Sequence, residues 1–157
     1  MNSTYRIVVG VDGTVGADLA LRWAAAETEA RGGTVQAVMA WTWDGPSLAG
    51  PPLANHPSEV REYAERTLTD AVRAVATRCP EAIIATETIQ GRAATVLVHA
   101  AANADLLVLG SHGHGRLHHA VLGSVAEECV RAATCPVVVV PLKIGTDTPA
   151  PAEVAVG

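Results

Sequence analysis

The chain has 157 residues, of which 49% are hydrophobic and 17% charged, and its formal net charge is −5 at pH 7. This length suits one domain with a substantial core. The acidic balance disfavours nucleic acid and anionic membranes as partners. No apolar run approaches the ~18 residues of a membrane span and no leader pattern opens the chain, so we expect no membrane contact and a cytoplasmic location.

Short apolar runs alternate with longer segments of helical periodicity, which predicts a parallel sheet covered by helices on both faces. In chain order we expect a strand near 5–11, a helix near 16–31, a strand near 34–41, a helix near 58–78, a strand near 82–89, a helix near 92–103, a strand near 105–110, a helix near 123–133 and a strand near 136–140. The apolar face predicted for the last helix comprises Leu122, Val125, Ala126 and Cys129.

Two segments fall outside this alternation. Residues 44–57 contain four prolines and two glycines. We predict a loop there, either a lid over a ligand or a plain insertion. Residues 143–157 are predicted to be a disordered tail, which leaves residues 1–142 as a single domain without internal repeats.

Three cysteines, Cys79, Cys129 and Cys135, lack the paired spacing of zinc or redox sites. Their odd number does not suit a disulfide framework. We therefore expect small buried residues at all three positions.

A glycine-rich stretch follows the fourth predicted strand. Gly110 and Gly113 close the strand, and Gly123-Ser124 stand at the start of the last helix. Glycines let backbone N–H groups approach an anion, and a helix start offers unpaired N–H groups, so the stretch suits a polyphosphate. Alternatively, it is a crossover loop with Ser124 as an ordinary N-cap. The Walker and Rossmann glycine patterns are both missing.

The spacing Gly-x2-Gly-x9-Gly-Ser after an apolar strand resembles the ATP-binding signature of the universal stress protein family. The resemblance extends through residues 7–14, 20–24, 105–110 and 136–140. It implies an open five-stranded parallel sheet in the order 3-2-1-4-5, with helices on both faces, of the adenine nucleotide alpha-hydrolase-like type. An ATP site would then lie between the ends of the first and fourth strands.

The same resemblance implies which residues meet the nucleotide. Asp12 would face the ribose or a Mg²⁺ ion on the phosphates, although an Asx turn or a helix cap explains this residue equally. Ala40 would contact adenine through its backbone. The full expected set is Val11, Asp12, Gly13, Thr14, Ala40, Gly110, Ser111, His112, Gly113, His114, Gly123, Ser124 and Val125.

Four histidines, His112, His114, His118 and His119, crowd the predicted phosphate loop. Zinc is an alternative, but no acidic or cysteine residue of the loop completes a tetrahedral set, so we expect no metal site. His112 or His114 could approach a phosphate, more strongly when protonated. Similar histidine motifs in nucleotidyl transferases follow the first strand rather than the fourth, which argues against adenylyl transfer.

No residue set supplies both a base and charge stabilisation for phosphoryl transfer. The sequence therefore favours an ATP-binding regulatory module over an enzyme. Slow ATP hydrolysis or autophosphorylation remains one alternative, and a nucleotide-independent interaction protein another. ATP, ADP and other adenine nucleotides all remain open as the occupant.

The last predicted strand, Val137–Val140, is β-branched and lies between two prolines. At a sheet edge it would pair with a second copy of the chain, whereas an interior position would bury it. Family members commonly dimerise through their last strand, so the resemblance implies a homodimer through residues 136–140. Trp41 and Trp43 would pack near that interface or belong to the core.

Overall fold

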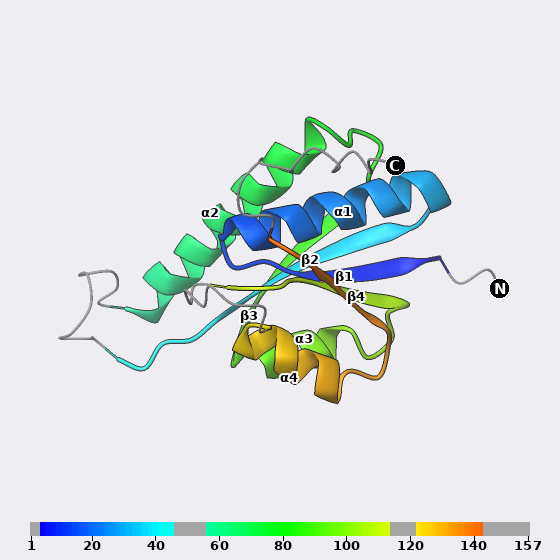
Figure 1. Cartoon of the computed structure of the whole chain (residues 1–157). Coiled ribbons are helices and arrows are strands. Elements are labelled where there is room, and N and C mark those ends of the chain that lie inside the picture. Colours follow the sequence, from blue (N-terminus) through cyan, green and yellow to red (C-terminus); the bar gives the residue numbers. More distant parts are fainter. Residues whose placement is uncertain (1–3, 46–55, 114–121, 143–157) are drawn as a thin grey trace, which may run out of the picture.

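The computed structural model describes residues 4–45, 56–113 and 122–142. They form a five-stranded parallel sheet in the order β3-β2-β1-β4-β5 (Figure 1). The elements are β1 (Arg6–Gly10), α1 (Val15–Arg31), β2 (Thr34–Trp41), α2 (Pro57–Ala76), β3 (Ile84–Gln90), α3 (Ala93–Ala100), β4 (Leu106–Gly110), α4 (Ser124–Ala132) and β5 (Val137–Val140). The predicted alternation and strand order are confirmed, with element ends shifted by a few residues. The predicted tail, 143–157, lies outside the described residues.

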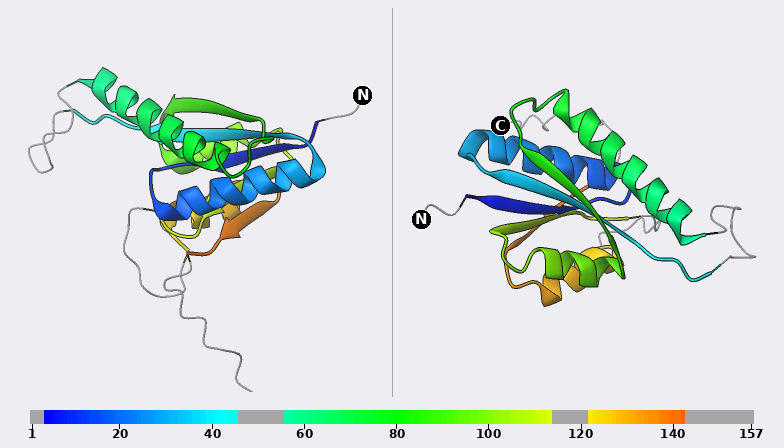
Figure 2. Two further views of the ribbon diagram at one scale, coloured as in Figure 1. Left: turned by 90° about the horizontal axis from the view of Figure 1, so that it is seen from above. Right: turned by 180° about the vertical axis from the view of Figure 1, so that it is seen from behind.

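The helices cover the sheet in two layers, α1 and α2 on one face and α3 and α4 on the other (Figures 1 and 2). Successive side chains along a strand point alternately to the two faces of the sheet. On β1, Ile7 and Val9 point into the core beneath α1 and α2, while Val8 points into the core beneath α3 and α4. Strand β1 is therefore buried on both faces, as its continuous apolar run predicts.

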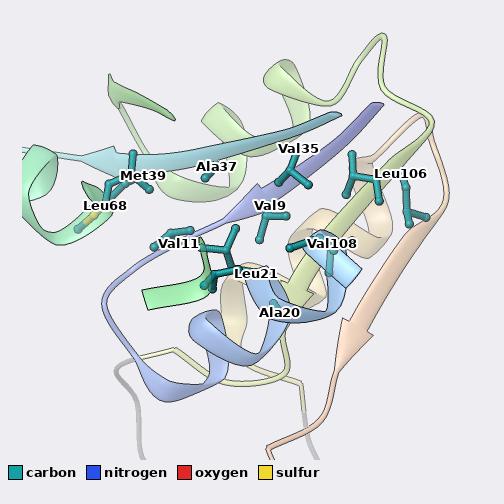
Figure 3. Packing of buried hydrophobic residues seen from close by; sticks show 14 of the residues in the cluster. Val9, Val11, Ala20, Leu21, Val35, Ala37, Met39, Leu68, Leu106 and Val108 are labelled. Atoms are coloured by element: carbon teal, nitrogen blue, oxygen red, sulfur yellow. The ribbon is translucent and has the colours of Figure 1, made fainter. Parts of the chain in front are cut away.

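Small aliphatic side chains build the core, because the chain contains no phenylalanine. Beneath α1, Leu21 is fully buried and packs with Val9, Val35 and Val108 in one cluster (Figure 3). The alanines on the inner face of α1, among them Ala20, let this helix approach the sheet closely. This packing gives the ends of β1 and β4 a rigid support.

Helix α1 has well-defined ends. Thr14 caps its N-terminus, accepting a hydrogen bond from Ala17 N at 3.3 Å, and Gly32 ends it with φ of 79°. At Gly33 a Cβ atom would lie 2.2 Å from Tyr5 O, and φ is 123°. Only glycine fits this turn into β2.

Helix α2 begins at Pro57, with His56 as the N-cap. The predicted loop 44–57 is therefore too long by one residue at its end, because proline is favoured in a first helical turn. Residues 46–55, to which the lid alternative applies, lie outside the described residues. Along the described ranges, no helix is long and apolar enough to cross a membrane.

Helix α4 differs from the prediction in two respects. Its N-cap is Gly123 rather than Ser124, and no side chain caps it. Its buried stripe consists of Ala126 and Cys129, whereas Val125 is 37% exposed. Successive residues of an α-helix are rotated by about 100° around its axis. Val125 therefore points away from the core although its neighbour Ala126 points into it.

The three cysteines differ in burial. Cys129 is fully buried, as predicted, but Cys79 and Cys135 are only partly buried. All three are free thiols. Burial raises the pKa of Cys129 to about 11, with Glu128 as a smaller cause, and burial is also the main reason why the pKa of Cys135 is raised.

Strand β5 lies at one edge of the sheet and pairs with β4. Its four valines are all partly buried. The edge position is therefore confirmed and the interior alternative is wrong. Trp41 packs against the core beneath α1 and α2. Trp43 is partly buried, with a buried ring nitrogen that has no hydrogen-bond partner among the described residues.

Candidate functional site

A pocket of about 510 Å³ opens at the carboxyl ends of the central strands. Strands β1 and β4 are neighbours there, which is where the winding of the sheet reverses direction and where ligands bind in open α/β sheets. Residues from three strand ends and three helix starts line the pocket: Gly10, Val11, Asp12, Ala17, Val38, Met39, Ala40, Ala93, Leu97, Leu109, Gly110, Ser111, His112, Gly113, Gly123, Ser124, Val125 and Ala126.

Most of the predicted site residues meet in this pocket. Those that line it are Val11, Asp12, Ala40, Gly110, Ser111, His112, Gly113, Gly123, Ser124 and Val125. Gly13 and Thr14 do not line it. His114, with His118 and His119, lies outside the described residues. The glycine loop and the loop after β1 thus face one pocket, as their positions at neighbouring strand ends predict.

Sequence reasoning missed the apolar wall of the pocket. Its residues are Ala17, Val38, Met39, Ala93, Leu97, Leu109 and Ala126, together with Gly10. Nothing in the sequence pattern distinguishes these side chains from ordinary core residues. The strand order implied by the resemblance is enough to predict that the end of β2 lies at this pocket. It does not predict that the start of α3 lies there as well.

Asp12 forms an Asx turn. Its Oδ1 accepts hydrogen bonds from the Thr14 backbone N–H at 3.0 Å and from Thr14 Oγ1 at 2.5 Å. Its Oδ2 faces the glycine loop, because a Cβ atom at Gly113 would lie 2.9 Å from it. The carboxylate therefore serves the turn with one oxygen and presents the other to the pocket. Thr14 holds the Asp12 side chain in this orientation through these two hydrogen bonds.

The glycine loop packs directly on the first turn of α1. A Cβ atom at Gly110 would lie 2.7 Å from the carbonyl carbon of Gly16, and one at Gly16 would lie 2.9 Å from His112 O. Both distances are too short for any side chain. Gly16, which the sequence analysis did not single out, is thus as necessary for this approach as Gly110.

Ser111 connects the glycine loop to the chain that leaves β5. Its N–H donates to Val140 O at 3.0 Å, and its Oγ accepts from Leu142 N at 3.1 Å. Its carbonyl oxygen accepts from Gly123 N at 2.7 Å. The buried hydroxyl of Ser111 is therefore part of the framework that holds the loop.

The imidazole of His112 lies between this framework and the pocket. Its Nδ1 lies 3.0 Å from Ser111 Oγ, and its Nε2 is buried without a hydrogen-bond partner among the described residues. A buried ring nitrogen without a partner is costly unless a ligand or water satisfies it. Within the described ranges, no three His, Cys, Asp or Glu side chains gather to hold a metal ion.

The start of α4 supplies hydrogen-bond donors to the pocket. Its first helical hydrogen bond runs from Glu127 N to Gly123 O at 2.9 Å. The N–H groups of Ser124, Val125 and Ala126 precede that bond, and all three residues line the pocket. Together with the helix dipole, these groups favour an anion.

Among the described residues that line the pocket, Asp12 is the one carboxylate. No lysine or arginine stands among the described residues that line it. Burial raises the pKa of Asp18, in the first turn of α1, and the nearby Asp12 adds to this shift. Any anion bound here would depend on backbone N–H groups, and a cation would suit the Asp12 side of the pocket.

Comparison with known proteins identifies the family. The sequence profile of the universal stress protein family matches residues 4–141. The chain belongs to this family. It is 35% identical to the universal stress protein Rv2005c of Mycobacterium tuberculosis over 133 residues, which cover 85% of this chain and 44% of the relative. The chain thus spans about half the length of the curated relatives that it matches.

Solved structures share the fold of this universal stress protein. UspA from Lactobacillus plantarum superposes with a TM-score of 0.69 and 26% identity, covering 88% of this chain and 99% of that one. A universal stress protein in complex with cAMP superposes with a TM-score of 0.64 and 22% identity, covering 90% of this chain and 100% of that one. The fold is therefore the adenine nucleotide alpha-hydrolase-like fold.

Proposed function

We propose that this chain binds an adenine nucleotide, ATP by preference, and acts as a nucleotide-dependent regulatory module in the response to stress. The observation that carries the proposal is the pocket at the ends of β1 and β4. It combines an apolar wall with a set of backbone N–H groups at the start of α4. An apolar wall suits a base, and convergent N–H groups suit phosphates.

The base would occupy the side of the pocket formed by the end of β2 and the start of α3. Val38 and Leu97 are buried there and Ala40 ends the wall. The small side chain of Ala93 leaves room beside the backbone of Ala40. Main-chain N–H and C=O groups at this position would then recognise the edge of adenine.

The phosphates would occupy the side formed by Gly113, Gly123 and the first turn of α4. Because no lysine or arginine lines this part of the described chain, binding would rely mainly on backbone N–H groups and the helix dipole. Mg²⁺ would neutralise the phosphates, and Asp12 is the carboxylate in the described lining that would hold it. His112 Nε2 would gain a phosphate oxygen or a water as its missing partner.

The comparison with the cAMP complex supports an adenine nucleotide as the ligand class. That protein shares the fold at 22% identity. Its ligand and the proposed one have the adenosine part in common, which is the part that the apolar wall would hold. The polyphosphate preference rests on the glycine loop of this chain alone.

A regulatory role fits the pocket better than turnover. Asp12 is engaged by Thr14, and Nδ1 of His112 lies 3.0 Å from Ser111 Oγ. No second carboxylate, lysine or arginine lines the described part of the pocket to stabilise a transferred phosphoryl group. A nucleotide that binds one conformation more tightly shifts the population toward it.

We also propose that the chain forms a homodimer through β5. Within the described ranges, this edge strand pairs with β4 on one side only, and its four valines are partly buried. Pairing with β5 of a second copy would give the outer backbone groups hydrogen-bond partners and would bury the valines further. Sedimentation equilibrium tests this proposal, and a monomer at micromolar concentrations would refute it.

Calorimetry with ATP, ADP and GTP, each with and without Mg²⁺, tests the nucleotide proposal. We expect ATP to bind more tightly than GTP, and Gly113→Ala to weaken ATP binding, because the new Cβ would lie 2.9 Å from Asp12 Oδ2. An overnight assay of released phosphate separates a sensor from a slow ATPase. Absence of ATP binding in both metal states would refute the proposal.

A further inference from the structure

Helices α3 and α4 are joined on their outer side by an ion pair with two parallel hydrogen bonds. Arg92 Nη1 donates to Glu128 Oε1 at 2.6 Å, and Arg92 Nη2 donates to Glu128 Oε2 at 2.5 Å. The hydrogen bond to Glu128 also raises the pKa of Arg92 above its ordinary value. A two-pronged pair of this kind fixes the relative orientation of its partners as well as their distance.

Both helices contribute walls to the nucleotide pocket. Arg92 is the N-cap of α3 and immediately precedes Ala93, which lines the base side. Glu128 lies about one helical turn beyond Ser124, which stands at the phosphate side. Figure 1 shows α3 and α4 together on one face of the sheet. The ion pair therefore bridges the base side and the phosphate side from outside the pocket.

The α4 side of the packing between the two helices is built from small side chains, because the buried residues of α4 are Ala126 and Cys129. Ala94 of α3 and Ala126 and Cys129 of α4 belong to one buried cluster. The Cys129 Sγ atom lies 4.0 Å from Ala94 O. Such small side chains form shallow ridges, so they resist rotation or sliding of α4 less than long interlocking side chains would. The ion pair adds two charged hydrogen bonds to this contact.

We propose that the Arg92–Glu128 pair positions the start of α4, so that its first N–H groups converge on the nucleotide phosphates at the right distance from the base wall. The inference rests on the proposed nucleotide function. Arg92 and Glu128 are positioning residues, because neither lines the pocket. Sites of this kind need placement within about 0.5 Å, and a loosened helix end loses that placement even when the fold is intact. Exposed ion pairs contribute little to global stability, so the effect is expected on binding.

The test compares the affinities for ATP and adenosine in Arg92→Gln and Glu128→Gln. We expect ATP to bind about threefold to tenfold more weakly in both variants while adenosine affinity is unchanged. The charge-swapped variant, Arg92→Glu with Glu128→Arg, should recover part of the loss. Arg131→Gln is the matched control, since it breaks the 2.6 Å pair with Glu127 inside α4 and leaves the bridge to α3 intact.

Equal losses for ATP and adenosine, or no loss for either, would overturn the inference. If the wild-type chain binds neither compound, the proposed function fails, and amide exchange of Gly123 then decides the positioning role. The Gly123 N–H donates to Ser111 O at 2.7 Å, so its exchange reports how firmly the start of α4 is held. Faster exchange in Arg92→Gln than in Arg131→Gln supports the inference, and equal exchange in the two variants contradicts it.

Discussion

The hydroxyl of Ser111 accepts a hydrogen bond from the backbone N–H of Leu142 at 3.1 Å. This bond ties the glycine loop after β4 to the chain that leaves β5. A second hydrogen bond, from Ser111 N to Val140 O, joins the same residue to β5. The two bonds hold the glycine loop against the edge strand through which we propose dimerisation. Ser111 is thus a buried residue that contacts both the pocket and the chain at the end of β5.

Ser111→Ala should lower the free energy of unfolding by about 1 to 2 kcal/mol, because Leu142 N and His112 Nδ1 would both lose the Ser111 hydroxyl as a partner in a partly buried place. Urea denaturation measures the loss. Ser124→Ala is the control, since the Ser124 side chain is exposed and makes no capping bond. Its stability should stay within about 0.5 kcal/mol of the wild type. Equal stabilities of the two variants would show that the Leu142 bond contributes nothing.

Asp12→Asn should separate the two roles of Asp12. The amide oxygen can still accept from Thr14 N and Thr14 Oγ1, so the turn should persist and the stability should change little. The negative charge is lost, so the gain in ATP affinity on adding Mg²⁺ should shrink. Calorimetry with and without Mg²⁺ measures this gain. An unchanged gain would exclude Asp12 as the cation contact.

Asp12→Ala provides the complement, because it removes the acceptor as well as the charge. We expect it to destabilise the chain as well as to weaken the response to Mg²⁺. A stability equal to that of Asp12→Asn would mean that the turn does not depend on the Asp12 side chain.

Gly16→Ala should destabilise the chain although alanine favours helices. Its Cβ would lie 2.9 Å from His112 O, a backbone atom that cannot rotate away. Overpacking of this kind costs about 1 to 3 kcal/mol, more than the gain in helix propensity. ATP affinity should fall in parallel, because α1 would push the glycine loop out of place. Thermal unfolding and calorimetry give the two readouts.

Gly32→Ala is the matched control for Gly16→Ala. No atom lies within 4 Å of a Cβ at Gly32, but its φ of 79° is unfavourable for alanine. This variant should lose stability through backbone strain alone and keep its ATP affinity. A matching loss of affinity in Gly32→Ala would show that general destabilisation, rather than the contact with His112, weakens binding.

The sequence predicted the sheet well because its signals are local. Residues such as Leu107 and Val108 lie in a continuous apolar run between turn residues, and buried parallel strands require such a run. The pocket was predicted only in part. Glycines and Asp12 stand out in a sequence, but Leu97 looks like any core residue. Its place in the pocket depends on how α3 packs across the sheet, which no local pattern specifies.

Burial of Cys129 predicts a loss of stability in alkaline solution. Its pKa rises from an ordinary 9.0 to about 11 in the folded chain, so the folded state holds this proton more tightly than the unfolded state. The resulting stabilisation is complete below pH 9.0 and is lost as the pH rises toward about 11. The contribution of this thiol should fall by up to ~1 kcal/mol per pH unit in that window.

Cys129→Ala should remove this dependence. The variant is expected to be less stable than the wild type at pH 7, because a buried sulfur is lost, but the difference should narrow between pH 9 and 11. Urea denaturation at several pH values gives the stability curves of both proteins, and their difference isolates the contribution of Cys129. A constant difference across this range would mean that the Cys129 thiol ionises equally in the folded and unfolded states, which its complete burial argues against.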